Sequence, residues 1–307
     1  MRTWGRLVGH EALVPPREPT RETRELHPIL PQALNLLSIP STPLTSTLSL
    51  TPDQLAAVDG GRELDLPGGP DAVLLLHGLT GAPFEMHHLA LRLAAEGYRC
   101  LAPVMAGHGR TPEDLVGIPW TEWVAHARRD LARLSGARRV FVAGSSMGAL
   151  VACALAHDLP GQVDGLVLLA PALELQATGK LGALLGRSAL LWRKIVPKGS
   201  GSDVRDPEMK LRNPCLTGVP LGAVAELQAL GERVDSLLPG VAAPALVVFG
   251  AQDHTVTLAG AKRLARRIGS GPAELLLLPE SYHLVGVDVE RERCADAVIG
   301  FLASLKE

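Results

Sequence analysis

The chain contains few cysteines and no concentration of basic charge, and each absence argues against a class of protein. Its four cysteines are scattered through 307 residues, and no C-x-x-C pair indicates a zinc or redox site. The formal net charge is -2, and no basic stretch carries interleaved aromatic residues. We therefore expect no nucleic acid partner and no zinc, and the cysteine pattern fits a reducing compartment.

Long apolar runs are missing as well. The longest fall well short of the roughly 18 residues that a membrane-spanning helix requires. The first residues carry some positive charge, but His10, Glu11, Pro15 and Pro16 interrupt any apolar stretch of the kind found in a signal peptide. We expect a cytoplasmic protein without a stable membrane anchor.

The chain divides into four segments by composition and periodicity. Residues 1–60 are interrupted by many prolines and predict a poorly ordered N-terminal extension. Residues 61–171 and 241–307 alternate short apolar runs with helical patterns, which predicts a parallel α/β sheet flanked by helices. Residues 172–240 contain helical runs at Leu181–Ile195 and Leu221–Leu238, and we expect a small helical cap inserted before the last two strands.

The most informative stretch runs from Val140 to Leu150. An apolar β-branched run is followed by Gly144-Ser145-Ser146-Met147-Gly148 and then by a helix of small and apolar residues. G-x-S-x-G between a strand and a helix is the pattern of a nucleophile elbow, in which a strained turn exposes the central serine. The pattern predicts Ser146 as a nucleophile, with the N–H of Met147 at a helix N-terminus as one oxyanion donor.

A serine nucleophile needs a base and an acid that orients the base. In α/β folds with a nucleophile elbow, both follow strands, and the order along the chain is Ser, then Asp or Glu, then His. His283 follows the expected strand Ala273–Leu278, and Asp253 follows Ala245–Phe249 directly. We predict these two residues as base and acid. The alternatives are weaker: His254 adjoins Asp253, so the two side chains diverge, while Asp235 precedes a strand and Asp288 follows His283.

Other polar residues receive structural interpretations. The backbone N–H of Leu79, in the loop after strand Ala72–Leu76, is the expected second oxyanion donor. We expect His77 and His108 to hold loops by hydrogen bonds. The pair His87-His88 is expected on a helix surface, because no further ligand stands at metal-binding spacing.

Several segments together resemble the α/β-hydrolase superfamily. They are L-L-L-H-G-L-T-G at 74–81, G-H-G at 107–109, G-S-S-M-G at 144–148, G-A-Q-D at 250–253 and the late His283. Within it the chain is similar to bacterial carboxylesterases and monoacylglycerol lipases, grouped with serine aminopeptidase S33-like hydrolases. The resemblance covers about residue 62 to the end. It implies a Ser146–Asp253–His283 triad, an oxyanion hole of Leu79 and Met147, a helical cap and no cofactor.

These observations predict a serine hydrolase that cleaves carboxylic esters through an acyl-enzyme. Leucines at 181, 184, 185, 190 and 191 and apolar residues from 221 to 237 are expected partly to pack the cap and partly to line an acyl pocket. The expected substrates are therefore short-to-medium acyl esters or monoacylglycerols. A peptidase, amidase or thioesterase with the same residues is the alternative, and a non-catalytic ligand-binding protein on this fold is a third.

Overall fold

The structure is a computed structural model that describes residues 60–199, 201–269, 271 and 273–305. The expected N-terminal extension, apart from Gly60, lies outside these residues. Among them, no helix combines the length and the apolar character that crossing a bilayer requires.

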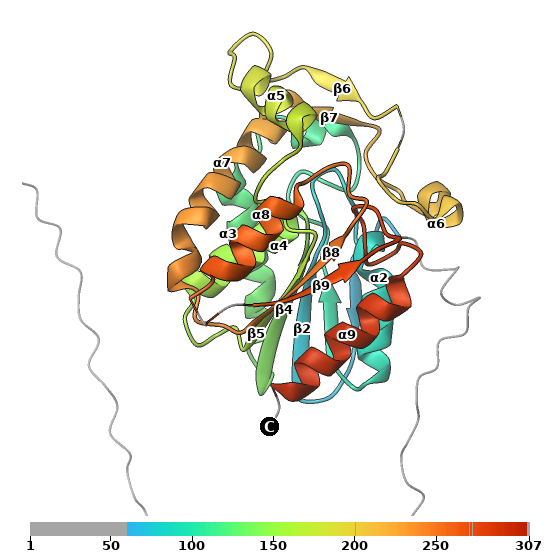
Figure 1. Ribbon diagram of the computed structural model, residues 1–307, viewed down its shortest axis with the longest axis vertical. Coiled ribbons are helices and arrows are strands. Elements are labelled where there is room, and N and C mark those ends of the chain that lie inside the picture. The colour runs from blue at the N-terminus through green and yellow to red at the C-terminus, as the bar shows by residue number, and fades with distance from the viewer. Residues whose placement is uncertain (1–59, 200, 270, 272, 306–307) are drawn as a thin grey trace, which may run out of the picture. The chain divides into compact units, whose positions relative to one another are not determined.

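A seven-stranded sheet forms the centre of the described part of the chain (Figure 1). Its order is β1-β3-β2-β4-β5-β8-β9, and only the edge strand β1 runs antiparallel to its neighbour. The predicted α/β-hydrolase fold with a mostly parallel sheet is confirmed. The central strands are buried along their whole length, as expected where helices cover both faces. The bounds are β1 Leu64–Leu66, β2 Asp71–Leu76, β3 Arg99–Ala102, β4 Arg139–Ser145, β5 Gly165–Leu169, β8 Ala245–Gly250 and β9 Glu274–Leu278.

Helices cover the two faces unequally. Helices α2 (Phe84–Ala95) and α9 (Arg291–Ser304) pack on one face, where they lie together in Figure 1. The other face carries four helices, which are α3 (Trp120–Ala132), α4 (Met147–Asp158), α7 (Leu221–Leu237) and α8 (Leu258–Arg267). Helix α4 is buried on nearly all sides, because it lies between the sheet and helices α3 and α7.

The segment between β5 and β8 differs from its prediction. Helix α5 (Ala177–Gly186) is shorter than the expected Leu181–Ile195, and β6 (Ile195–Pro197) pairs antiparallel with β7 (Gly218–Pro220). Such pairing joins distant residues, so local periodicity cannot reveal it. A short helix α6 (Pro207–Arg212) lies between these strands, and η2 (Leu238–Gly240) follows α7.

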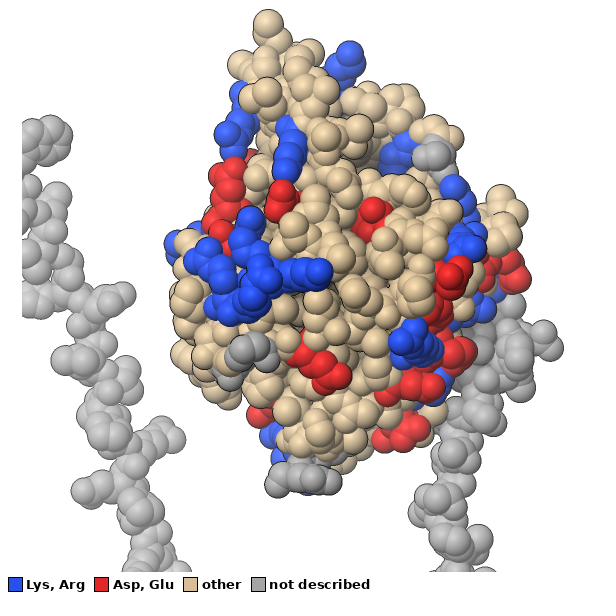
Figure 2. Space-filling model, in the orientation of Figure 1, with Lys and Arg blue, Asp and Glu red and all other residues tan. Residues whose placement is uncertain are grey.

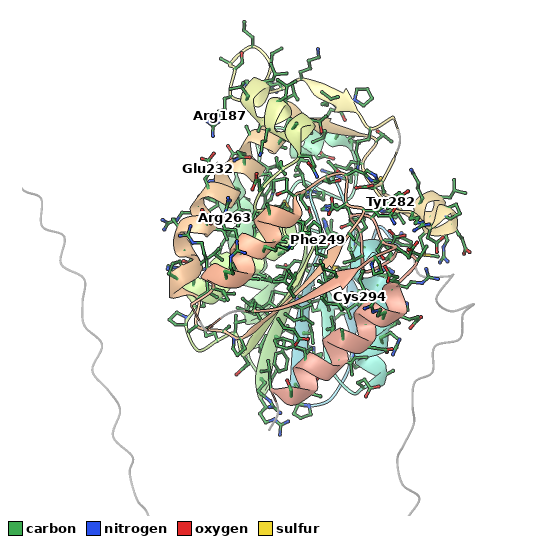
Figure 3. All side chains as sticks on the ribbon, in the orientation of Figure 1. Arg187, Glu232, Phe249, Arg263, Tyr282 and Cys294 are labelled. Carbon is green, nitrogen blue, oxygen red and sulfur yellow. The ribbon has the colours of Figure 1, made fainter. Side chains whose placement is uncertain are left out.

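An ion pair ties α5 to α7. The guanidinium of Arg187 lies 3.2 Å from the carboxylate of Glu232, and Figure 3 labels both side chains. Both side chains are more than half exposed, so the pair contributes little to stability. The close packing of the two helices is carried instead by Gly186, where an added Cβ would lie 2.0 Å from the carbonyl oxygen of Leu221.

A side chain from α7 satisfies the start of α3. The helix begins at Trp120, whose N–H donates to the Glu226 carboxylate at 2.9 Å.

The expectation for His87 is wrong. This residue is buried rather than on a helix surface, and its ring lies 6.3 Å from that of Phe84.

Basic side chains gather over α8 on the face seen in Figure 2. This helix carries Lys262, Arg263, Arg266 and Arg267. Part of its charge is balanced, since Arg263 and Arg267 both pair with Asp235.

The turn between β4 and α4 brings three backbones into contact. A Cβ on Gly144 would lie 2.2 Å from the backbone of Gly148, and a Cβ on Gly148 would lie 2.2 Å from the carbonyl oxygen of Leu76 in β2. Neither neighbour is a side chain that could move aside. Glycine at both positions is therefore a packing requirement of this crossing.

Gly148→Ala should lower the free energy of unfolding by about 1–3 kcal/mol, the usual cost of forcing atoms into a packed core. The matched control is Gly300→Ala, also within a helix, where an added Cβ meets nothing within 4 Å. That control should gain about 0.5–1 kcal/mol, because alanine favours a helix more than glycine does. Urea unfolding of both variants measures the difference; equal gains would contradict the packing account.

Candidate active site

Ser146 occupies a strained position at the β4–α4 turn. Its backbone has φ +55° and ψ −108°, a region that non-glycine residues rarely adopt. The surrounding backbone fixes this geometry, since the N–H of Ser146 donates to the carbonyl of Leu169 at 2.8 Å and its carbonyl accepts from the N–H of Ala172 at 3.2 Å. The residue is nearly buried, and its side chain contributes to the wall of a cavity.

His283 and Asp253 form a buried pair beside this serine. Nδ1 of His283 lies 2.7 Å from Oδ2 of Asp253, with the two side chains 7% and 0% exposed. The other oxygen of Asp253 accepts the backbone N–H groups of Thr255 at 2.7 Å and Val256 at 2.8 Å. The carboxylate is thereby held in one orientation, and Nε2 is the ring nitrogen left for other partners.

Two opposing effects act on the pKa of His283. Burial disfavours the charged imidazolium, but the charge and hydrogen bond of Asp253 outweigh it, so the pKa is raised above its ordinary value of 6.5. Asp203 and Glu85 add to this increase. Ser146 and His283 line the same cavity, although no hydrogen bond joins the serine hydroxyl to the imidazole among the described contacts. Such contacts often tighten only when substrate binds.

His254, the alternative base, is placed differently. Its side chain is 64% exposed and its Nδ1 lies 2.9 Å from Asp203, while its ring meets that of Tyr282 edge-on at 4.6 Å. The neighbouring Asp253 turns away from it toward His283. As expected for adjacent residues, the side chains of Asp253 and His254 therefore point toward different partners.

The two expected oxyanion donors follow the carboxyl ends of neighbouring parallel strands, Leu79 after β2 and Met147 after β4. Met147 is the first residue of α4, so its N–H has no acceptor within the helix. Leu79 belongs to residues 77–81, here called the oxyanion loop, and lines the cavity. Its N–H donates to no other described residue.

Two buried histidines hold this loop, as the sequence predicted. Nε2 of His77 accepts the N–H of Met105 at 3.0 Å, and Nε2 of His108 accepts the N–H of Thr80 at 3.0 Å. Burial lowers the pKa of His77 to about 3 and that of His108 to about 4, so both rings are neutral and able to accept. Thr80 itself is held at φ +61°.

The cavity has a volume of about 840 Å³, large enough for a drug-sized ligand. Its apolar lining comes from Leu79, Leu175, Val219, Val224, Leu227 and Leu284. Val224 and Leu227 were among the expected pocket residues. The prediction was wrong for three leucines of the same segment, because Leu181 and Leu184 of α5 and Leu190 after it are 57%, 65% and 92% exposed.

Sequence reasoning missed the polar part of the lining. Glu85, Lys198 and Asp203 all contribute, and Lys198 donates to the hydroxyl of Thr80 at 3.0 Å. Asp203 accepts the backbone N–H of His254 and the hydroxyl of Thr255, each at 3.0 Å. The only signal in the sequence was the polar, glycine-rich character of residues 198–206, which does not indicate where the segment lies.

Asp288, set aside as a candidate acid, has a structural role. It is fully buried, and among the described hydrogen bonds the carboxylate partner of His283 is Asp253 rather than Asp288. One oxygen accepts the N–H of Tyr282 at 2.7 Å, and the other accepts those of Arg205 and Asp206 at 3.0 and 2.9 Å. A single carboxylate thus joins the loop that carries His283 to the segment before α6.

Within the described residues, no group of three or more His, Cys, Asp or Glu side chains is arranged to hold a metal ion. All four cysteines are unpaired, and burial raises the pKa of Cys100, Cys153 and Cys294 to about 12.

The chain is similar in sequence to known ester hydrolases. The chain is 28% identical over 252 residues to a thermostable monoacylglycerol lipase of Bacillus sp. (strain H-257), covering 82% of this chain and 98% of that one. It is 25% identical over 240 residues to a carboxylesterase of Bacillus subtilis (strain 168), covering 78% and 94%.

Solved structures give the same fold. A chain described with the metagenome-derived lipolytic enzymes LipS and LipT matches with a TM-score of 0.73 and 28% identity, covering 80% of this chain and 99% of that one. A monoacylglycerol lipase of Paleococcus ferrophilus shares the fold with a TM-score of 0.67 at 20% identity, covering 79% and 98%. The model of the serine aminopeptidase S33 family matches residues 70–290. The chain therefore belongs to this family of α/β-hydrolases.

Proposed function

We propose that this α/β-hydrolase cleaves short-to-medium acyl esters or monoacylglycerols through an acyl-enzyme formed on Ser146. The chain is a carboxylic ester hydrolase, like the relatives that match most of its length. The observation that carries the proposed mechanism is the buried His283–Asp253 contact of 2.7 Å beside the same cavity as Ser146. A base oriented by a carboxylate next to a strained serine is the arrangement that nucleophilic acyl transfer requires.

In the first half of the reaction, Ser146 Oγ attacks the ester carbonyl while Nε2 of His283 takes the hydroxyl proton. Asp253 holds the imidazole by Nδ1 and stabilises the imidazolium that forms. The carbonyl oxygen becomes an oxyanion, which the N–H groups of Leu79 and Met147 bind. The tetrahedral intermediate then collapses, the C–O bond to the alcohol breaks, and His283 gives its proton to the leaving alcohol.

In the second half, a water molecule replaces the alcohol. His283 takes a proton from the water as it attacks the acyl carbonyl, and the same two N–H groups stabilise the second oxyanion. Collapse of this intermediate releases the carboxylic acid and returns the proton to Ser146. The reaction needs no metal or cofactor for any of its steps.

The proposed substrates follow from the cavity and its cover. We propose that residues 172–240 act as a cap, since they contribute Leu175, Val219, Val224 and Leu227 to the lining. This apolar group can bury part of an acyl chain. Lys198 and Asp203, from the same segment, can contact a polar alcohol part such as glycerol. The monoacylglycerol lipase among the relatives is consistent with such a substrate.

The main alternative is cleavage of an amide, peptide or thioester by the same residues. An aminopeptidase needs carboxylates to bind the substrate's ammonium group, and Glu85 and Asp203 both line the cavity. Both already accept hydrogen bonds from the protein, however, and Lys198 adds a positive charge on the same wall. We therefore favour the ester. We also propose that the protein acts in the cytoplasm, because its cysteines are unpaired.

Ser146→Ala should reduce kcat on the order of 10⁴- to 10⁶-fold, the usual cost of losing a triad nucleophile. A fluorophosphonate probe should label the wild type and leave this variant unlabelled. His283→Ala should lose comparable activity, whereas His254→Ala should keep most of it. Persistent labelling of Ser146→Ala would refute the nucleophile, and equal losses in the two histidine variants would refute the choice of base.

Activity should rise with pH through a pKa above 6.5. Only the neutral imidazole of His283 accepts the serine proton, and Asp253 raises the pKa of that group. A profile of kcat/KM against pH measures this acidic limb, over a range in which the fold is intact. His254→Ala is the control and should leave the acidic limb unchanged. A shift of this limb in His254→Ala would show that His254, not His283, is the group that titrates.

Chain-length selectivity tests the substrate class. Across p-nitrophenyl esters from acetyl to palmitoyl, kcat/KM should rise several-fold per methylene, because each buried CH₂ contributes roughly 0.8 kcal/mol, until the apolar lining is filled. Prolyl-nitroanilide should be cleaved far more slowly. A flat profile would indicate an unselective site, and faster cleavage of the anilide would indicate a peptidase.

A further inference from the structure

We propose that Glu85 is a positioning residue that fixes the oxyanion loop, so that the N–H of Leu79 keeps its orientation toward Ser146. The proposal rests on the proposed function of Ser146, because it assigns Glu85 a role in stabilising the oxyanion formed there. Glu85 lies in the first turn of α2 and is 4% exposed, and it lines the cavity.

The carboxylate of Glu85 contacts the loop directly. Its Oε2 accepts the N–H of Gly78 at 2.9 Å, and Gly78 immediately precedes Leu79. Burial raises the pKa of Glu85, while the Gly78 N–H, Lys198 and His283 act in the opposite direction. A buried carboxyl group is costly unless it makes hydrogen bonds, so its position inside the site calls for a role there.

The loop is shaped to receive this carboxylate. A Cβ on Gly81 would lie 2.2 Å from Oε1 of Glu85, and a Cβ on Gly78 would lie 3.2 Å from both Oε2 and the Cβ of Ser146. The carboxylate therefore fills the space that side chains at positions 78 and 81 would take. Glu85 and Ser146 line the same cavity.

The remaining contacts of the loop leave one peptide group for Glu85 to hold. The carbonyl of Gly78 contacts Nδ1 of His77 at 2.9 Å and accepts the N–H of Gly81 at 3.1 Å, and it belongs to the same peptide group as the Leu79 N–H. Thr80 is held through His108 and through its carbonyl, which accepts the N–H of Leu216 at 2.8 Å. The peptide group before Gly78 is held by Glu85.

Glycine makes this contact necessary. Gly78 has no side chain, so both of its backbone dihedrals are free to change unless the peptide groups on either side are fixed. Without an acceptor for its N–H, the first of these peptide groups can rotate, and the second, which carries the Leu79 N–H, is then held only through its Gly78 carbonyl and can tilt away from the oxyanion. A donor displaced by about 1 Å can cost on the order of 10² in rate.

Glu85→Leu and Glu85→Gln test the proposal on a p-nitrophenyl ester. Leucine removes the acceptor, and kcat should fall about 10- to 100-fold while KM changes less than about threefold. Glutamine keeps an oxygen that can accept the Gly78 N–H, so its kcat should stay within about threefold of the wild type. Glu96→Leu, at the exposed C-cap of the same helix, is the matched control and should leave kcat unchanged.

Three outcomes would overturn the positioning role: wild-type kcat in Glu85→Leu, equal losses in the leucine and glutamine variants, or a change confined to KM. If Glu85→Leu does not fold, Gly81→Ala replaces it, since the added Cβ pushes the carboxylate off Gly78 and should lower kcat in the same way. Wild-type kcat in a folded Gly81→Ala would equally overturn the proposal. Fluorophosphonate labelling of the wild type distinguishes failure of the Glu85 proposal from failure of the proposed function, because an unlabelled Ser146 refutes the proposed function itself.

Discussion

The close approach of α4 to the ends of β2 and β4 is the constraint on which the site depends. Glycine at positions 144 and 148 lets three backbones meet where an alanine would overlap a neighbour at 2.2 Å. This contact sets Ser146 at φ +55° and starts α4 at Met147, beside the loop that leaves β2. The serine, the helix N-terminus and the oxyanion loop therefore share one region, because this crossing brings the ends of β2 and β4 and the start of α4 together.

Buried polar groups around this crossing are matched to specific backbone partners. His77 and His108 accept N–H groups of neighbouring loops, Glu85 accepts that of Gly78, and Asp253 accepts two while holding His283. An unmatched buried polar group costs roughly 1–3 kcal/mol, so each partner stabilises one arrangement of the loops. For the proposed mechanism, the consequence is a site whose donors are oriented before a substrate arrives. Asp288 likewise accepts backbone N–H groups of the segment before α6, and this segment forms part of the cavity wall.

Much of the fold was accessible from the sequence because its signals are local. The apolar runs at 72–76 and 245–249 predicted buried strands, and the glycine spacing at 144–148 predicted the elbow. Asp253 and His283 were selected because they follow strands, and the structure brings them into contact; their catalytic roles stay a prediction. What could not be predicted depends on distant partners. The β6–β7 pairing, the Glu226 carboxylate at the start of α3 and the exposure of Leu190 all follow from tertiary packing. In sequence, Glu85 is an ordinary acidic residue in a first helical turn.

The identity of the residue that carries the acyl group tests the account most directly. Rapid acid quenching during the first turnover of a p-nitrophenyl ester, followed by peptide mapping with mass spectrometry, locates any covalently bound acyl group. The account predicts one acyl group per chain, attached to Ser146, formed together with a burst of p-nitrophenol. An acyl group on another residue, or full turnover without a covalent intermediate while substrate is saturating, would contradict it.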